Sequence, residues 1–358
     1  MKVFGKQHKK ITLWYILFWV AAIYFLIIMR FAGHSSEITN PIDPNIPINR
    51  PLFLRMGLAG AVLIGISFGF LEILFEKRFF RQMSYGRLII SKSIIYMIIF
   101  VAVMAFLSIR NQQLSLGYFD YDSWQRSFFD PNLLIPISYL AVASMLLNFV
   151  KEVSLKFGPG NLWKMLIGKF HRPQEEERIL MFLDLRSSTT IAEKLGHIKY
   201  SELIQDCFSD LAIVKYQHAE IYQYVGDEAV LSWRVSEGLR NNNCIHAFYA
   251  FKDLLEKRSE HYQKRYGLVP FFKAGMNLGK VTVAEVGQIK KEIAFHGDTV
   301  NTAARIQGKC NELNSEFLIS ESLKEKLSGK GFRNEIIGKV ALQGKREEIN
   351  VYAVLRQE

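Results

Sequence analysis

Four apolar segments lie within the first 150 residues, and each has about the 20 residues that an α-helix needs to cross a lipid bilayer. A backbone inside hydrocarbon must satisfy its own hydrogen bonds, so such segments fold as helices. The sequence therefore predicts an α-helical four-span transmembrane bundle over residues 1–150. The predicted spans are approximately 11–32, 52–75, 88–109 and 132–150.

The positive charge of the chain lies beside these segments. The 358 residues carry a formal net charge of +11, and a basic chain can bind nucleic acid. Here, basic residues precede the first span and separate the second from the third, a positive-inside distribution. We therefore expect a multi-pass cell-membrane protein with a cytoplasmic amino terminus, a cytoplasmic region after residue 150 and no nucleic-acid partner. The basic residues concerned are Lys2, Lys6, Lys9, Lys10, Lys77, Arg78, Arg81 and Arg87.

Two features of the membrane half are not explained by hydrophobicity alone. Residues 110–131 are rich in aromatic side chains, which fits either an interfacial aromatic belt or a sensor site for a small molecule or lipid. Glu72 lies inside the second predicted span, where a carboxylate facing lipid is costly. We expect Glu72 to face other helices or the inner interface.

The segment 151–177 joins the membrane half to the rest of the chain. Gly158-Pro159-Gly160 predicts the end of any helix that leaves the membrane. The following apolar and basic stretch, which contains Trp163, fits either the membrane surface or packing on a partner copy. In either case we expect a juxtamembrane coupling segment.

From residue 178 to 358 the pattern becomes that of a soluble α/β domain. Its opening β-α-β-β-α-β order predicts an α+β ferredoxin-like (split βαβ) sheet. The three cysteines of the chain are scattered, which indicates reduced structural thiols and no zinc site. The expected strands are 178–184, 219–225, 228–234, 270–278, 280–286, 291–295 and 316–319, and the expected helices are 189–217, 237–265 and 298–312.

Two aspartates stand at the tips of predicted strands. Asp184 ends the phrase Met-Phe-Leu-Asp, and Asp227 lies in the turn of the hairpin that follows Tyr-Gln-Tyr-Val-Gly. In a ferredoxin-like sheet these two positions share one edge, so we expect them to be neighbours. Two carboxylates placed in this way can hold a pair of Mg²⁺ ions over a triphosphate.

A third phrase, Gly-Asp-Thr-Val-Asn301-Thr-Ala-Ala-Arg305, places an amide and a guanidinium on one helix face. Together with the two aspartate phrases, it resembles the catalytic domain of the class III adenylate/guanylate cyclases over about residues 178–356. The resemblance implies that ATP or GTP is cyclised at the interface of two catalytic domains. It therefore implies a head-to-tail homodimer, with a membrane domain that anchors it in the bilayer.

The resemblance also implies roles for individual residues. Two Mg²⁺ (or Mn²⁺) ions per active site would be bound by Asp184, Asp227 and the backbone carbonyl of Leu185. One ion would lower the pKa of the ribose 3′-hydroxyl and the other would neutralise the leaving pyrophosphate. Asn301 would orient the ribose, and Arg305 would neutralise charge on the α-phosphate. Each site would combine the aspartates of one subunit with Asn301 and Arg305 of the other.

The remaining implied contacts are to the phosphates and the purine. Ser187, Ser188 and Thr189 occupy the place where backbone amides of the family meet the phosphates at a helix start. The family also has a lysine late in the domain that binds the triphosphate. This position is assigned to Lys345, and in the alternative alignment register it is Gln343. The purine-contacting positions are Gln223 and Ala294, which match neither the adenine nor the guanine pair of the family.

The resemblance implies an adenylate cyclase that makes cyclic AMP, because ATP is favoured by its frequency as a substrate within the family. One alternative is a guanylate cyclase that makes cyclic GMP. Another is a membrane receptor whose cyclase-like domain binds nucleotide without turnover. A diguanylate cyclase is disfavoured because its Gly-Gly-Asp/Glu-Glu-Phe turn is absent from the sequence.

Overall fold

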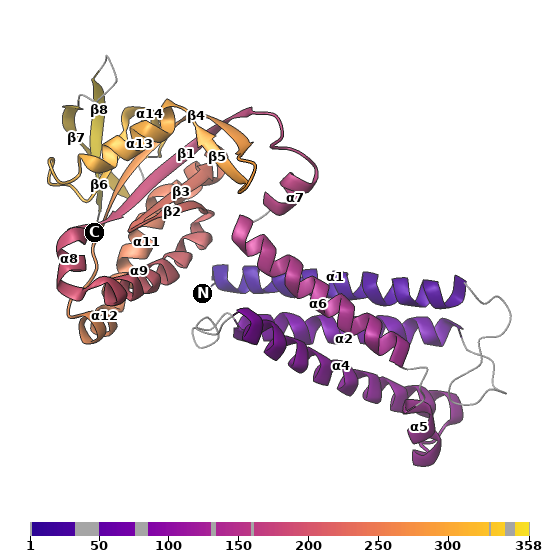
Figure 1. Cartoon of the computed structure of the whole chain (residues 1–358). Coiled ribbons are helices and arrows are strands. Elements are labelled where there is room, and N and C mark those ends of the chain that lie inside the picture. The colour runs from indigo at the N-terminus through magenta and orange to yellow at the C-terminus, as the bar shows by residue number, and fades with distance from the viewer. Residues whose placement is uncertain are drawn as a thin grey trace. The chain divides into compact units, whose positions relative to one another are not determined.

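The computed structural model describes most of the chain and divides it into two compact units, Met1–Val153 and Ser154–Glu358. Figure 1 shows the helical first unit and the sheet-containing second unit. The described residues are 2–32, 50–75, 85–129, 134–158, 161–328, 331–340 and 348–357.

The first unit is helical. Four of its helices contain a stretch long and apolar enough to cross a membrane, namely Ile11–Met29, Arg50–Phe75, Gly86–Leu114 and Ile135–Ser154. The chain is therefore a candidate four-span membrane protein, as the apolar segments predicted. The helices are α1 (Lys2–Ala32), α2 (Arg50–Phe75), α4 (Tyr85–Leu116), the short α5 (Tyr121–Phe128) and α6 (Leu134–Phe157).

Small residues and aromatic rings pack the first unit. A Cβ added to Gly65 of α2 would lie 2.5 Å from the Cα of Ile16 on α1, so glycine permits close approach of these two helices. The Phe68 ring lies 5.1 Å from Trp19 and is stacked 3.8 Å from Tyr96, measured between ring centroids. These contacts join α1, α2 and α4.

Glu72 faces other helices, as predicted. Its Oε2 accepts hydrogen bonds from the hydroxyls of Tyr15 (2.9 Å) and Tyr96 (3.1 Å). Its Oε1 lies 3.0 Å from Lys92 Nζ and also pairs with Lys151 of α6. The partners of this α2 carboxylate thus come from the other three long helices, α1, α4 and α6.

Helix α6 ends at Phe157, immediately before Gly158, whose φ is +82°. This end agrees with the Gly-Pro-Gly break predicted from the sequence. Pro159 and Gly160 lie outside the described residues.

The second unit contains an eight-stranded sheet in the order β2-β3-β1-β4-β6-β8-β7, with β5 paired to β4. The first four strands of this order, with two helical segments between them in sequence, form the expected ferredoxin-like core. The strands are β1 (Gln174–Leu185), β2 (Glu220–Val225), β3 (Glu228–Arg234), β4 (Phe272–Val286), β5 (Glu292–His296), β6 (Phe317–Ser320), β7 (Phe332–Val340) and β8 (Ile349–Arg356). The α-helices are α7 (Asn161–Leu166), α8 (Ser188–Leu195), α9 (His197–Leu211), α10 (Val235–Leu239), α11 (Asn243–Lys257), α12 (Ser259–Tyr266), α13 (Asp298–Gly308) and α14 (Glu321–Lys324).

Four expected elements, two strands and two helices, have different boundaries. The strands expected at 270–278 and 280–286 are one continuous strand, β4, because Gly279 provides room for Thr299 of α13 and does not form a turn. The helix expected at 189–217 is divided at Gly196, whose φ is +73°. The helix expected at 237–265 is interrupted before α11 by Asn241 and Asn242, which both have positive φ.

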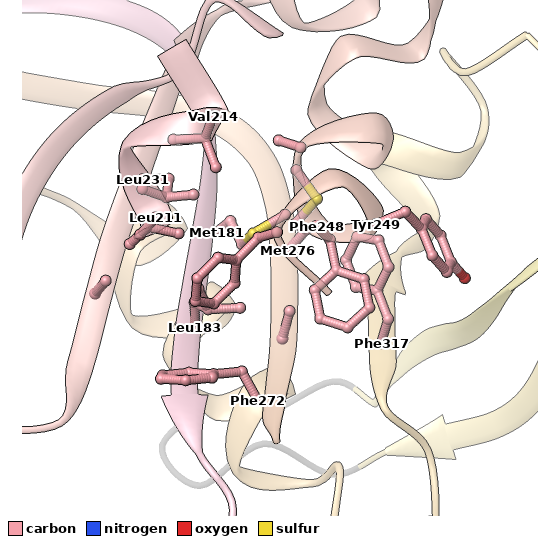
Figure 2. Close-up of a cluster of buried hydrophobic side chains, with 14 of the residues drawn as sticks. Met181, Leu183, Leu211, Val214, Leu231, Phe248, Tyr249, Phe272, Met276 and Phe317 are labelled. Atoms are coloured by element: carbon pink, nitrogen blue, oxygen red, sulfur yellow. The ribbon is translucent and has the colours of Figure 1, made fainter. Parts of the chain in front are cut away.

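Alternate residues of β1 pack on opposite faces of the sheet. Ile179, Met181 and Leu183 join a cluster with residues of α9, α11 and α12, and Figure 2 shows Met181 and Leu183 within it. Leu180 and Phe182 join a second cluster with residues of α13. The sheet therefore holds β1 between two apolar layers, and its carboxyl end carries Asp184 to the edge.

Candidate active site

Asp184 is the penultimate residue of β1, between two charged residues on the neighbouring strands. It pairs with Glu228 of β3 on one side and with Lys273 of β4 on the other. Its Oδ2 lies 3.2 Å from Lys273 Nζ and accepts a hydrogen bond from Gln307 Nε2 at 3.0 Å. Two donors therefore share one carboxylate oxygen.

Asp227 lies in the two-residue turn between β2 and β3, where Val225 pairs with Glu228. Gly226 begins the turn with a φ of +61°, a conformation that glycine adopts without strain. The Oδ2 atom of Asp227 is buried and has no hydrogen-bond partner among the described residues. A buried carboxylate oxygen without a partner is costly unless another group, such as a cation, completes it.

The carboxylates of this edge affect one another. Burial raises the pKa of Asp184 above its usual value, and the charge of Asp227 raises it further, while Lys273 acts in the opposite direction. Burial, followed by the charges of Asp184 and Asp227, raises the pKa of Glu228 to about 7. The structure thus brings the two predicted aspartates together in a region with excess negative charge.

The donor set fits Mg²⁺ or Mn²⁺. In the described part of the chain, no group of three His, Cys, Asp or Glu side chains could hold a metal ion. Magnesium, however, is commonly bound through one or two carboxylates together with substrate phosphates and water. Asp184 and Asp227 supply such a pair, and the Leu185 carbonyl lies at the end of the same strand.

The predicted phosphate-binding segment follows β1 directly. Ser187 is the N-cap of α8 with a φ of +57°, and its side chain makes no capping hydrogen bond. The first amides of an α-helix have no partner within the helix. Ser188 and Thr189 begin α8, so their amides lie where an anion can be bound.

Asn301 and Arg305 lie on the face of α13 that is turned away from the sheet. At about 100° per residue, they are on the opposite side from Ala303 and Ile306, which are fully buried. Asn301 is exposed and Arg305 is half-buried. Within the described residues, no hydrogen bond or ion pair joins either of them to Asp184 or Asp227.

The two predicted purine-contacting residues, Gln223 and Ala294, belong to β2 and β5, which contact each other through side chains. The Tyr222 hydroxyl accepts a hydrogen bond from Phe295 N at 2.9 Å, and their rings are stacked 4.3 Å apart. Gln223 and Ala294 are the sequence neighbours of these residues. Gln223 is exposed and Ala294 is half-buried.

One predicted residue cannot be placed. Lys345 lies in residues 341–347, outside the described residues, as does Gln343.

Two side chains at the site were not predicted from the sequence. Lys273 and Gln307 are 9% and 6% exposed, and both contact Asp184. The one signal for Lys273 in the sequence was its charge within the otherwise apolar strand segment Phe272-Lys-Ala-Gly-Met. Gln307 gave no comparable signal.

Comparison with known proteins agrees with this geometry. The family model described as Adenylate and Guanylate cyclase catalytic domain matches residues 171–356. The chain belongs to this family. The motifs around Asp184, Asp227 and Arg305 had predicted membership of this family.

Individual cyclases resemble the chain over part of its length. It is 32% identical over 227 residues to Adenylate cyclase 2 of Rhizobium meliloti (strain 1021), a match covering 63% of this chain and 62% of that protein. It is 27% identical over 184 residues to an adenylate cyclase of Anabaena cylindrica, covering 49% of this chain and 36% of that protein. A bacterial light-regulated adenylyl cyclase shares the fold with a TM-score of 0.53 and 21% identity, covering 63% of this chain and 66% of that chain.

Proposed function

We propose that the chain is a membrane-bound adenylate cyclase that converts ATP to 3′,5′-cyclic AMP and pyrophosphate. In this reaction the ribose O3′ forms a bond to the α-phosphorus. The bond from that phosphorus to the bridging oxygen breaks, and the hydroxyl proton is released. The observation that carries the proposal is the pair Asp184 and Asp227 at one sheet edge, with a buried Asp227 oxygen that lacks a partner among the described residues.

The aspartates and the Leu185 carbonyl would hold two divalent cations, which supply charge neutralisation and a lowered pKa of the attacking hydroxyl. The amides at the start of α8 and the lysine assigned as Lys345 would bind the phosphates. Lys273, already 3.2 Å from Asp184, would add a positive charge at the same edge. Gln223 and Ala294 would line the purine site.

Each site would be shared between two subunits. Asn301 and Arg305 face away from the sheet of their own chain, which supports their use by a partner copy. Arg305 would then stabilise the charge that develops on the α-phosphate, an effect that depends on accurate placement of the guanidinium. A homodimer with two-fold symmetry would contain two such sites.

The membrane half would anchor this dimer and place the catalytic domain in the cytoplasm. The division would be a membrane domain at 1–150, a coupling segment at 151–177 and a catalytic domain at 178–358. Basic residues beside the apolar segments support this orientation.

Incubating the purified full-length chain with ATP or GTP and Mg²⁺ or Mn²⁺ tests the activity and the substrate. Cyclic AMP identified by mass spectrometry is the expected product. A preference for GTP would assign the chain as a guanylate cyclase, and nucleotide binding without turnover would assign it as a receptor.

Mixed subunits test the shared site. Asp227→Ala and Arg305→Ala should each lower turnover at least about a hundredfold. Their equimolar mixture should recover about a quarter of the wild-type rate, because half of the dimers are mixed and each has one complete site. No recovery from two folded variants would contradict sharing.

A further inference from the structure

Helix α13 has two faces with different surroundings. Asn301 and Arg305 lie on the outward face, whereas Gln307 lies on the sheet side and is 6% exposed. From there Gln307 Nε2 donates a hydrogen bond of 3.0 Å to Asp184 Oδ2 of the same chain. One helix therefore carries residues for the proposed neighbouring site and a contact to the aspartate of its own site.

This hydrogen bond determines which oxygen of Asp184 is available. Oδ2 has both Gln307 and Lys273 as donors, while the rotation of an aspartate carboxylate is otherwise only loosely restricted. Two donors on one oxygen orient the carboxylate so that Oδ1 is directed elsewhere. An orientation of this kind is what partners of metal-binding carboxylates provide.

The backbone around Gln307 is itself tightly placed. A Cβ added to Gly275 of β4 would lie 2.1 Å from the backbone nitrogen of Gln307. Glycine therefore allows α13 to lie directly on β4, two residues from Lys273. The backbone of Gln307 is therefore held in place while its side chain hydrogen-bonds to Asp184.

We propose that Gln307 is a positioning residue for Asp184. It orients this carboxylate for a divalent cation within its own protomer, while Asn301 and Arg305 of the same helix serve the partner's site. The part that concerns the partner rests on the proposed function. Lys273 places a positive charge beside Asp184 Oδ2, whereas the neutral Gln307 only orients the carboxylate.

The first test measures metal binding without turnover. Gln307→Met keeps the length of the side chain and removes the donor, and Thr302→Val is the control. Thr302 is equally buried on α13, and its hydroxyl bonds to Asp298 and not to Asp184. Free Mn²⁺ is titrated by electron paramagnetic resonance against the full chain in detergent.

Gln307→Met should weaken Mn²⁺ binding about tenfold, as substitution of such supporting residues commonly does. Thr302→Val should not weaken it. Wild-type Mn²⁺ affinity in a folded Gln307→Met variant would overturn the proposal. If that variant does not fold, Gln307→Asn, whose amide is one methylene too short to reach Asp184, is expected to show the same loss.

The second test identifies the protomer in which Gln307 acts. In the mixed dimer, the Arg305→Ala subunit supplies the aspartates and the Asp227→Ala subunit supplies Arg305. Gln307→Met in the first subunit should lower turnover about tenfold, and in the second it should have a much smaller effect. Equal losses from both placements would overturn the proposal. If the unmodified mixture is inactive, the shared site fails, and Mn²⁺ binding alone decides the role of Gln307.

Discussion

Gly275 is the residue on which the placement of α13 depends. A methyl group there would meet the backbone nitrogen of Gln307 at 2.1 Å, and a helix backbone cannot move aside without shifting the whole element. Gly275→Ala should therefore destabilise the second unit by about 1–3 kcal/mol and lower turnover through misplaced Arg305. Thermal unfolding and the rate of cyclic nucleotide formation measure the two effects.

Gly308 provides the control for this substitution. It is the last residue of α13, and a Cβ added there has no neighbour within 4 Å. Gly308→Ala should leave stability unchanged or raise it by up to about 1 kcal/mol. Equal destabilisation by the two substitutions would show that close packing at Gly275 is unimportant.

The three cysteines should be unreactive in the folded chain. Burial raises the pKa values of Cys207, Cys244 and Cys310 to about 12. A raised pKa favours the protonated thiol, so at pH 8 only about one thiol in ten thousand is ionised. A disulfide reagent such as DTNB should label all three in denaturant and none within minutes in native protein. Rapid native labelling would contradict their burial.

At the scale of single residues, the sequence predicted both aspartates but not the two partners of Asp184. Asp184 and Asp227 were recognisable because each follows an apolar strand at a turn. Lys273 and Gln307 were not, because their contacts depend on the pairing of β1 with β4 and on the rotation of α13. Such partners are set by tertiary register, which local sequence does not encode.

Among the elements, the long helices of the first unit are joined by the ion pairs and hydrogen bonds of Glu72 with Tyr15, Lys92, Tyr96 and Lys151. Lys92 pairs with both Glu72 and Glu152, and Lys151 pairs with Glu72. The adjacent positions 151 and 152 point in directions about 100° apart on α6. Ion pairs at both positions therefore restrict rotation of α6 about its axis.

Glu72→Leu should destabilise the first unit by up to about 3–5 kcal/mol, because the buried Lys92 loses its nearer carboxylate and keeps only Glu152 at 3.5 Å, while Lys151 loses its ion pair with Glu72. Thermal unfolding of the full chain in lipid nanodiscs measures the effect. Tyr139→Phe is the control, since it removes only the hydrogen bond from α6 to Ala22 O of α1, worth about 0.6 kcal/mol in a membrane. If Glu72→Leu destabilises the chain no more than Tyr139→Phe does, Glu72 does not hold the helices together.

The order of the elements was predictable, whereas their interruptions were less so. Alternating apolar residues and turn signals indicated the β-α-β-β-α-β core. Gly279 was read as a break within β4, although it makes room for Thr299. Gly196 was read as part of a helix, although its φ of +73° ends α8. A glycine signals either close packing or a turn, and only the fold distinguishes them.

At the scale of the whole chain, the second unit begins before the expected catalytic domain. The sequence suggested that the stretch around Trp163 lies on a membrane or a partner copy. In the structure, the nearby Phe170 packs on the sheet of its own chain and is 4% exposed. Its carbonyl also accepts a hydrogen bond of 3.0 Å from Glu285 N. Part of the juxtamembrane segment thus belongs structurally to the catalytic unit.

Phe170→Ala should therefore destabilise the catalytic unit by about 3–5 kcal/mol, the range for removing a buried phenylalanine from a core. Trp163→Ala removes a larger ring, but one that is 67% exposed, so it should change stability by less than about 0.5 kcal/mol. Thermal unfolding of the full chain, followed through turnover of residual native enzyme, compares the two variants. If both substitutions have equally small effects on stability, the segment before β1 is only a linker. A selective loss at Phe170 would show that the segment before β1 contributes to the core of the unit that holds Asp184.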